Sequence, residues 1–289
     1  MGSTINTNVA SLNAQRNLAM STTSLSTSMQ RLSSGLRVNS AKDDAAGLAI
    51  AERMNAQVRG MNVGMRNAND GISMAQTAEG ALGKVGDALQ RMRELAVQAR
   101  NSTNSDADKT SLDKEFGELA KEIQRVLGGT TFNGKSILGA QAGSLTFQVG
   151  ANTTANDSID IVTSNMTTAT EITSVAGTYG SVDTSRAKID SSANSAALAT
   201  VINNIDTALD KVNSERATMG ASQSRFDAVV ASLQINIENQ SAARSRIMDA
   251  DFAIETANLS RAQILQQAGN AMVAQANQLP QQVLSLLKG

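Results

Sequence analysis

The sequence predicts a mainly α-helical protein in which long amino- and carboxy-terminal helices pack as an antiparallel coiled coil or bundle, with a small β-hairpin region in the middle. Apolar residues alternate at spacings of three and four over several heptads at both ends of the chain, a pattern typical of bundled helices. The chain has one proline, Pro280, so almost nothing interrupts a long helix. Aromatic residues are only 2% of the chain, and the aliphatic side chains that replace them suit helix-on-helix packing.

The amino-terminal helical zone is expected over residues 5–128. Its apolar stripe breaks at 37–44 and resumes over 50–100, which predicts a rod of roughly 75 Å. A polar turn at 101–106 then precedes a second helix over 112–127.

The carboxy-terminal zone repeats the helical pattern over 202–237, and a final helix follows over 254–287. Between the two zones, residues 145–149 and 158–161 alternate apolar and polar side chains, which predicts two strands of a hairpin. The Ser-, Thr-, Ala- and Gly-rich stretch 163–195 is expected to be a small exposed excursion or a flexible loop.

Composition argues against several classes of protein. The net charge of −1 provides no positive field to attract nucleic acid. The sequence has no stretch of about 20 apolar residues, so no membrane-spanning helix is expected. Zero Cys and zero His remove the commonest metal ligands and acid–base groups, so we expect no cofactor and no enzyme activity. The amino-terminal residues do not read as a cleaved secretory signal peptide.

Charge is missing from both ends of the chain. Arg16 is the only charged residue among the first 30. Residues 262–287 contain no ionisable side chain, so Gln and Asn form the polar face of that segment. Because a solvent-facing helix normally carries charges, we expect both ends to be buried against other copies of the chain. The alternative is a frayed, soluble amphipathic tail. The residues expected to make the assembly contacts are Ile5, Val9, Leu12, Leu18, Leu25, Met29, Leu32, Ile264, Leu265, Met272, Leu279, Val283, Leu286 and Leu287.

Residues 129–136 fit the phosphate-loop pattern G-x-x-x-x-G-K-[ST], with Lys135 and Ser136 in the phosphate and magnesium positions. That chemistry requires a buried strand before the loop and a helix after it. The sequence instead predicts a helix before the loop and glycine-interrupted chain after it. We therefore interpret this segment as a glycine-rich turn and set the nucleotide-hydrolase alternative aside.

Two pairs of segments resemble the signatures of bacterial flagellins. The amino-terminal pair is QRLSSGLRVNSAKDDAAG at residues 30–47 and NANDGISMAQTAEGAL at residues 67–82. The carboxy-terminal pair is SRIMDADF at residues 245–252 and RAQILQQAG at residues 261–269. Motifs of this length are highly specific.

The resemblance implies the subunit that polymerises into the extracellular bacterial flagellar filament, with a hook–filament junction protein as the alternative. It implies an inner-tube coiled coil from residues 1–44 and 245–289, and an outer-tube helical domain with a hairpin from 45–163 and 196–244. Residues 164–195 are then a short surface excursion, too small for additional outer domains. The implied partners are many copies of the chain, a flagellar export chaperone, and the cap and hook–filament junction proteins. Secretion through the flagellar type III apparatus is also implied.

The resemblance further assigns a segment to recognition by the animal flagellin-sensing Toll-like receptor. Its matching residues are Gln90, Arg91, Glu94, Leu95 and Glu115. From the residues alone, the charged members of this set are solvated groups on a helix, and Glu94 is placed to form a local ion pair.

Overall fold

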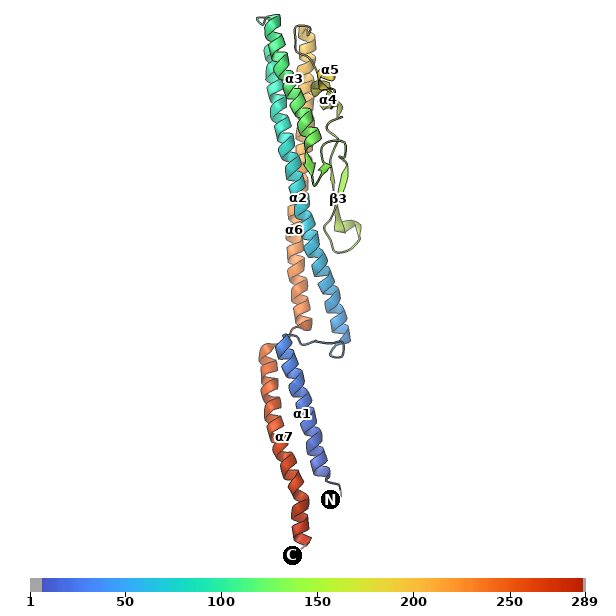
Figure 1. Ribbon diagram of the computed structural model, residues 1–289, viewed down its shortest axis with the longest axis vertical. Coiled ribbons are helices and arrows are strands. Elements are labelled where there is room, and N and C mark those ends of the chain that lie inside the picture. Colours follow the sequence, from blue (N-terminus) through green and yellow to red (C-terminus); the bar gives the residue numbers. More distant parts are fainter. Residues whose placement is uncertain (1–6, 288–289) are drawn as a thin grey trace. The chain divides into compact units, whose positions relative to one another are not determined.

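The computed structural model describes residues 7–287, with side chains described up to residue 278. The chain divides into two compact units, one made of Met1–Ala56 and Glu238–Gly289 and the other of Gln57–Ile237. The predicted mainly helical fold with small central hairpins is confirmed (Figure 1). Within the described part of the chain, no helix combines the length and apolarity needed to cross a membrane.

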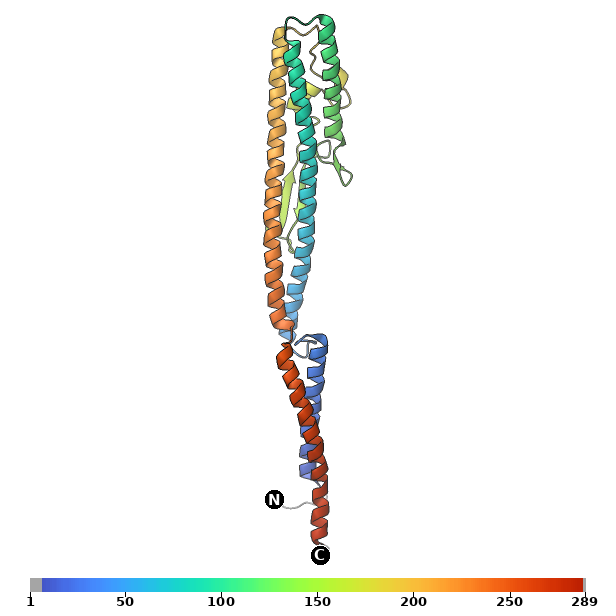
Figure 2. The same cartoon turned by 90° about the vertical axis from the view of Figure 1, so that its left-hand side faces the viewer.

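The larger unit is built on three helices: α2 (Ala45–Ala99), α3 (Asp106–Gly129) and α6 (Ser195–Met248). Ion pairing of Arg93 with Asp206, and a hydrogen bond from Gln223 to Glu79, show that α2 and α6 run antiparallel. Figure 2 shows α2 beside both α3 and α6. Much of the apolar stripe predicted on α2 and α6 lies in the core, whose fully buried members include Ala75, Leu82, Leu89, Met92, Ile205, Met219 and Phe226. The first part of the stripe predicted on α2, from Met54 to Met65, is only half-buried.

Phe226 is the largest side chain that α6 buries against α2, and the sequence makes room for it with a glycine. A Cβ atom at Gly71 would lie 2.8 Å from the ring carbon Cζ of Phe226, so only glycine permits this approach. The ring of Phe147, from the hairpin, meets Phe226 edge-on with centroids 5.6 Å apart. This contact ties two helices and the hairpin to one point of the core.

Two hairpins follow α3. Strands β1 (Thr131–Phe132) and β2 (Lys135–Ser136) are joined by Asn133 and Gly134, both with positive φ, as a two-residue Asn-Gly turn requires. Strands β3 (Ser144–Gln148) and β4 (Ser158–Val162) form the predicted hairpin, with η1 (Ala155–Asp157) in their connection. The chain directly after β3 lies against α2, where Gly64 leaves space for the carbonyl oxygen of Val149.

The segment between β4 and α6 differs from the flexible or exposed loop that its composition predicted. It contains α4 (Thr170–Ala176) and α5 (Val182–Ser185), and both pack on α3. Although the segment has few large apolar side chains, four of those few are fully buried: Met166, Ile172, Val175 and Ile189. Composition averages over the segment and so hides these inward-facing positions.

A buried ion pair anchors this segment. Both carboxylate oxygens of Asp113 on α3 accept hydrogen bonds from Arg186, at 2.9 and 2.6 Å, and Asp113 also accepts from the backbone N–H of Ile189. Burial by itself raises the pKa of the Asp113 carboxyl, but these hydrogen bonds outweigh it and leave that pKa below its ordinary value of 3.8.

The smaller unit pairs α1 (Val9–Ser34) with α7 (Phe252–Leu287). The side-chain amide of Asn8 donates to the carbonyl oxygen of Ala276 at 2.7 Å, while Arg31 lies 3.9 Å from Glu255, so the two helices are antiparallel. In the connection after α1, the Arg37 guanidinium donates to the backbone carbonyl of Ile247 at 2.7 Å and thereby caps the carboxy-terminal end of α6.

We expect Phe226→Ala to lower the free energy of unfolding by about 3–5 kcal/mol, because it empties a fully buried site between two helices and the hairpin. Urea titration followed by circular dichroism at 222 nm measures the change. Ile235→Ala is the matched control on the same helix, since Ile235 is 60% exposed, and its effect should stay within about 0.5 kcal/mol. Equal losses in the two variants would contradict the packing described.

We expect Asp113→Asn to destabilise the protein by about 3 kcal/mol at neutral pH, because it leaves Arg186 buried without its partner. The folded-state pKa of Asp113 is lowered, so its contribution is full above the unfolded-state pKa and is lost as pH falls through the folded-state pKa. The difference between variant and wild type, measured by urea titration from pH 7 to pH 2, should therefore shrink below about pH 4. Asp70→Asn, at an exposed aspartate on α2, should show neither effect.

Candidate functional site

Helix α1 has apolar side chains on two opposite sides, and α7 covers one of them. Leu18, Leu25 and Leu32 repeat every seven residues and are half-buried, and Leu18 lies against Gly269 of α7. Val9 and Leu12 point to the other side and are 66% and 56% exposed. The second stripe therefore has no partner in the described part of a single chain.

The face of α7 that meets α1 is made of small residues. Ala262, Gly269 and Ala276 also repeat every seven residues, and both alanines are buried. A Cβ atom at Gly269 would lie 3.1 Å from a methyl group of Leu18, which shows how closely the helices approach there. Leucines on one helix thus face small residues on the other, and the contact is narrow.

Because the contact is narrow, α7 also keeps apolar residues outside it. Ile254, Leu265 and Met272 are spaced by eleven and seven residues, which places them on one stripe of the helix. They are 60%, 50% and 62% exposed. Ile264, beside this stripe, is 66% exposed.

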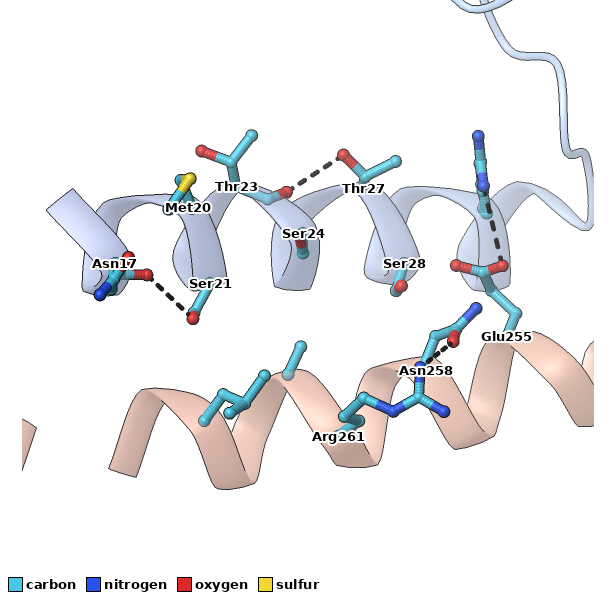
Figure 3. A pocket seen from close by; sticks show the side chains of 13 residues that line it. Asn17, Met20, Ser21, Thr23, Ser24, Thr27, Ser28, Glu255, Asn258 and Arg261 are labelled. Carbon is cyan, nitrogen blue, oxygen red and sulfur yellow. Dashed lines mark hydrogen bonds and ion pairs between the residues drawn. The ribbon is translucent and has the colours of Figure 1, made fainter. Parts of the chain in front are cut away.

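A groove of about 730 Å³ runs between α1 and α7 (Figure 3). Ser21 and Ser28 point from α1 toward α7, and Glu255 reaches back from α7, where it pairs with Arg31. The Glu255 side chain is only 8% exposed, and among the described residues Nε of Arg31 has no hydrogen-bond partner. The remaining lining residues are Asn17, Met20, Thr23, Ser24, Thr27, Asn258, Arg261, Ala262 and Leu265.

The predicted assembly residues fall into three groups. Six are exposed: Val9, Leu12, Met29, Ile264, Leu265 and Met272. Three are half-buried against α7: Leu18, Leu25 and Leu32. Ile5, and the side chains of Leu279, Val283, Leu286 and Leu287, lie outside the described residues.

The sequence-based list omitted three apolar residues on these helices. Met20 is 55% exposed and continues the outer stripe of α1, eight residues after Leu12. Phe252 and Ile254 are 65% and 60% exposed in the first turn of α7. The spacing of Met20 from Val9 could have identified it from the sequence as a member of the outer stripe. The exposure of Phe252 could not be predicted in this way, because it depends on α7 beginning at that residue.

The residues matched to receptor recognition lie where α2 meets α3. Arg91 donates from Nε to Glu115 at 2.9 Å and from Nη1 to Glu94 at 2.8 Å, so the predicted local pair with Glu94 is present. The hydrogen bonds that Arg91 donates, first of all to Glu94 and then to Glu115, raise the pKa of Arg91. Gln90 is exposed beside this network, but Leu95 is 1% exposed and belongs to the core.

The phosphate-loop pattern lies in the wrong structural context for nucleotide binding. Helix α3 ends at Gly129, and the pattern then forms the β1–β2 hairpin with its Asn-Gly turn.

The acidic residues Asp106 and Asp108 lie in the first turn of α3, where Ser105 and Asp108 form a reciprocal capping box. Within residues 7–287, no three His, Cys, Asp or Glu side chains are grouped closely enough to hold a metal ion.

The chain matches two protein-family models: the bacterial flagellin N-terminal helical region over residues 5–142 and the bacterial flagellin C-terminal helical region over residues 202–287. It is 43% identical to a flagellin of Xenorhabdus nematophila over the whole of both chains. It is 42% identical to a flagellin of Halalkalibacterium halodurans, covering 98% of this chain and 99% of that one.

Among solved structures, a putative flagellar hook-associated protein from Vibrio parahaemolyticus matches 72% of this chain and 100% of its own, with a TM-score of 0.61. Its identity of 13% shows a shared fold alone, so the hook–filament junction alternative is not favoured over the full-length flagellin matches. The chain belongs to the bacterial flagellin family and is a structural subunit of the flagellar filament.

Proposed function

We propose that the uncovered apolar stripes of α1 and α7 are the surfaces through which each subunit contacts neighbouring copies in the filament. One observation carries this proposal: α1 is apolar on two opposite sides, and α7 covers only one. If the second side of α1 stayed in contact with water, apolar side chains on it would add no stability. A neighbouring copy accounts for it, because flagellins polymerise with many copies of themselves.

Energetics support the same surfaces. Burying one large aliphatic side chain stabilises an interface by about 1.5–3 kcal/mol before entropy losses, so four or five such residues can drive association. The absence of ionisable side chains from residues 262–287 means that no charge there has to be desolvated. The groove between α1 and α7 offers a concave surface for an apolar side chain from the next copy, next to Met20 and Leu265.

We further propose that residues 1–44 with 245–289 form the inner-tube coiled coil, and that 45–163 with 196–244 form the outer-tube domain. In this arrangement 164–195 is a short surface excursion held on α3 by Asp113 and Arg186. The separate compact unit formed by Met1–Ala56 and Glu238–Gly289 supports the first assignment.

The remaining proposals concern the route and the partners of the subunit. It is exported through the flagellar type III apparatus with its chaperone and added outside the cell beneath the cap, above the hook–filament junction proteins. A chain without Cys has no disulfide to block unfolded passage. We propose a purely structural role without catalysis, which the lack of His and Cys supports.

We also propose that the animal Toll-like receptor binds the exposed network of Arg91, Glu94 and Glu115 together with Gln90. Its charged groups are held in one arrangement by the hydrogen bonds of Arg91, which reduces the entropy lost on binding. Leu95 acts from the core by positioning α2, since its side chain is not accessible.

Replacing Leu12 and Leu265 together, as Leu12→Gln/Leu265→Gln, tests the assembly surfaces. Each change removes about 2 kcal/mol of burial, so each should raise the critical concentration for polymerisation about 30-fold. Sedimentation of filaments from seeded, neutral solutions measures it, with circular dichroism as a check on helix content. Val162→Gln, at a 58% exposed apolar residue of β4, is the control and should polymerise normally. Normal growth of the double variant would sink the proposal.

Arg91→Ala should reduce receptor activation by purified monomers at least about tenfold, because two charge-assisted hydrogen bonds and the cation itself are lost. A reporter-cell dose response measures the effect. Arg125→Ala is the matched control, since Arg125 also forms an exposed ion pair, with Glu122 on α3. If both variants lose activity alike, or neither does, the proposed recognition surface is wrong.

A further inference from the structure

The sulfur atoms of this chain are distributed unevenly between core and surface. The chain has twelve Met and no Cys, so methionine is its only sulfur. Four methionines are buried at 0–2% exposure: Met74, Met92, Met166 and Met219. Four are half-buried: Met54, Met61, Met65 and Met248. Among the methionines that the structure describes, only Met20, Met29 and Met272 are exposed, at 55%, 56% and 62%.

All three exposed methionines lie on α1 or α7. Met20 belongs to the outer stripe of α1 with Val9 and Leu12, and it lines the groove near Leu265. Met272 belongs to the outer stripe of α7, seven residues after Leu265. Met29 is exposed on α1, five residues before its end at Ser34. The accessible thioethers are therefore concentrated on the helices that we propose to contact neighbouring copies.

An accessible thioether reacts with a hydroperoxide such as hydrogen peroxide. The sulfur lone pair attacks one peroxide oxygen, an S–O bond forms as the O–O bond breaks, and the products are methionine sulfoxide and water. Sulfur is oxidised by two electrons and the peroxide is reduced. Because access to the sulfur controls this reaction, Met20, Met29 and Met272 react before the core methionines.

Oxidation changes the nature of the surface. A sulfoxide converts a flexible apolar side chain into a polar one whose oxygen accepts hydrogen bonds from water. Placing it in an interface between helices removes that water, and an unpaired polar group there is costly. We propose that Met20, Met29 and Met272 are oxidation sites that reversibly switch off assembly of the free subunit. This inference rests on the proposed assembly surfaces.

The switch has two further properties. Residues covered by neighbouring copies lose access to peroxide, so assembled filaments should resist oxidation that inactivates free subunits. Methionine sulfoxide reductases reverse the modification, with two thiols giving a disulfide and water for each sulfoxide reduced. Since the chain has no Cys, a dithiol reductant has no other target in it.

The test treats dissociated full-length subunits with graded hydrogen peroxide, maps sulfoxides by peptide mass spectrometry and measures the critical concentration by sedimentation. Modification of Met20, Met29 and Met272 should precede that of the core methionines and raise the critical concentration at least about tenfold. Treatment with both stereospecific reductases and dithiothreitol should restore it. Preformed filaments should show the three sites protected.

Two triple variants separate the sites from general damage. Met20→Leu/Met29→Leu/Met272→Leu should still polymerise after peroxide, while the matched Met54→Leu/Met61→Leu/Met65→Leu should lose assembly as wild type does. Met20→Gln/Met29→Gln/Met272→Gln introduces polar side chains without oxidant. It should fail to assemble at wild-type concentrations while keeping its helix content.

The outcomes distinguish the two proposals. If untreated wild type does not polymerise, or if Leu12→Gln/Leu265→Gln polymerises normally, the proposed assembly surfaces fail. If wild type polymerises equally well with all three sites oxidised, or if reductase repair of the three sulfurs does not restore assembly, the oxidation switch is wrong and the assembly surfaces stand. Should the leucine triple variant not assemble, the order of sulfoxide formation and its repair in wild type decide the question.

Discussion

The pairing of α1 with α7 depends on one steric match, in which leucines on α1 lie against small residues on α7. Leu18 approaches Gly269 so closely that a methyl group at that position would press against it. Ala262 and Ala276 extend the small face by one heptad in each direction. The match lets the helices approach, but it is narrow, so most apolar residues of both helices remain outside the contact. The exposed stripes follow directly from this constraint.

The larger unit differs from this helix pair because its helices and hairpin form a continuous buried core. Aliphatic residues of α2, α3 and α6 pack together, and the β3–β4 hairpin closes one side through Phe147 and Phe226. Its buried carboxylates are paired: Asp113 accepts hydrogen bonds from Arg186, and the buried Glu215 accepts hydrogen bonds from Lys211 and Ser164. One chain thus combines a unit that buries an extensive core within itself with a unit that leaves most of its large apolar side chains exposed, which suits a subunit that polymerises.

The limits of sequence reasoning are clearest at particular residues. Leu95 and Arg91 belong to the same motif and, four residues apart, leave α2 on neighbouring sides. Leu95 is nevertheless core, whereas the longer Arg91 side chain ends among the exposed carboxylates of Glu94 and Glu115. The segment with α4 and α5 looked like a loop because its average composition is polar. Its packing depends on a few positions, above all Arg186, whose partner lies 73 residues away. Such pairs carry no local signal.

The sequence by itself determined the helical class, the break between α1 and α2, the β3–β4 hairpin, the apolar stripes and the family, because each depends on local periodicity, turn chemistry or long specific motifs. It also excluded the phosphate loop, since the residues on either side contradict that geometry. Tertiary structure alone decided which stripe is covered and which is free. Periodicity marks a face as apolar, but only the distance of approach between two particular helices determines whether another helix covers it.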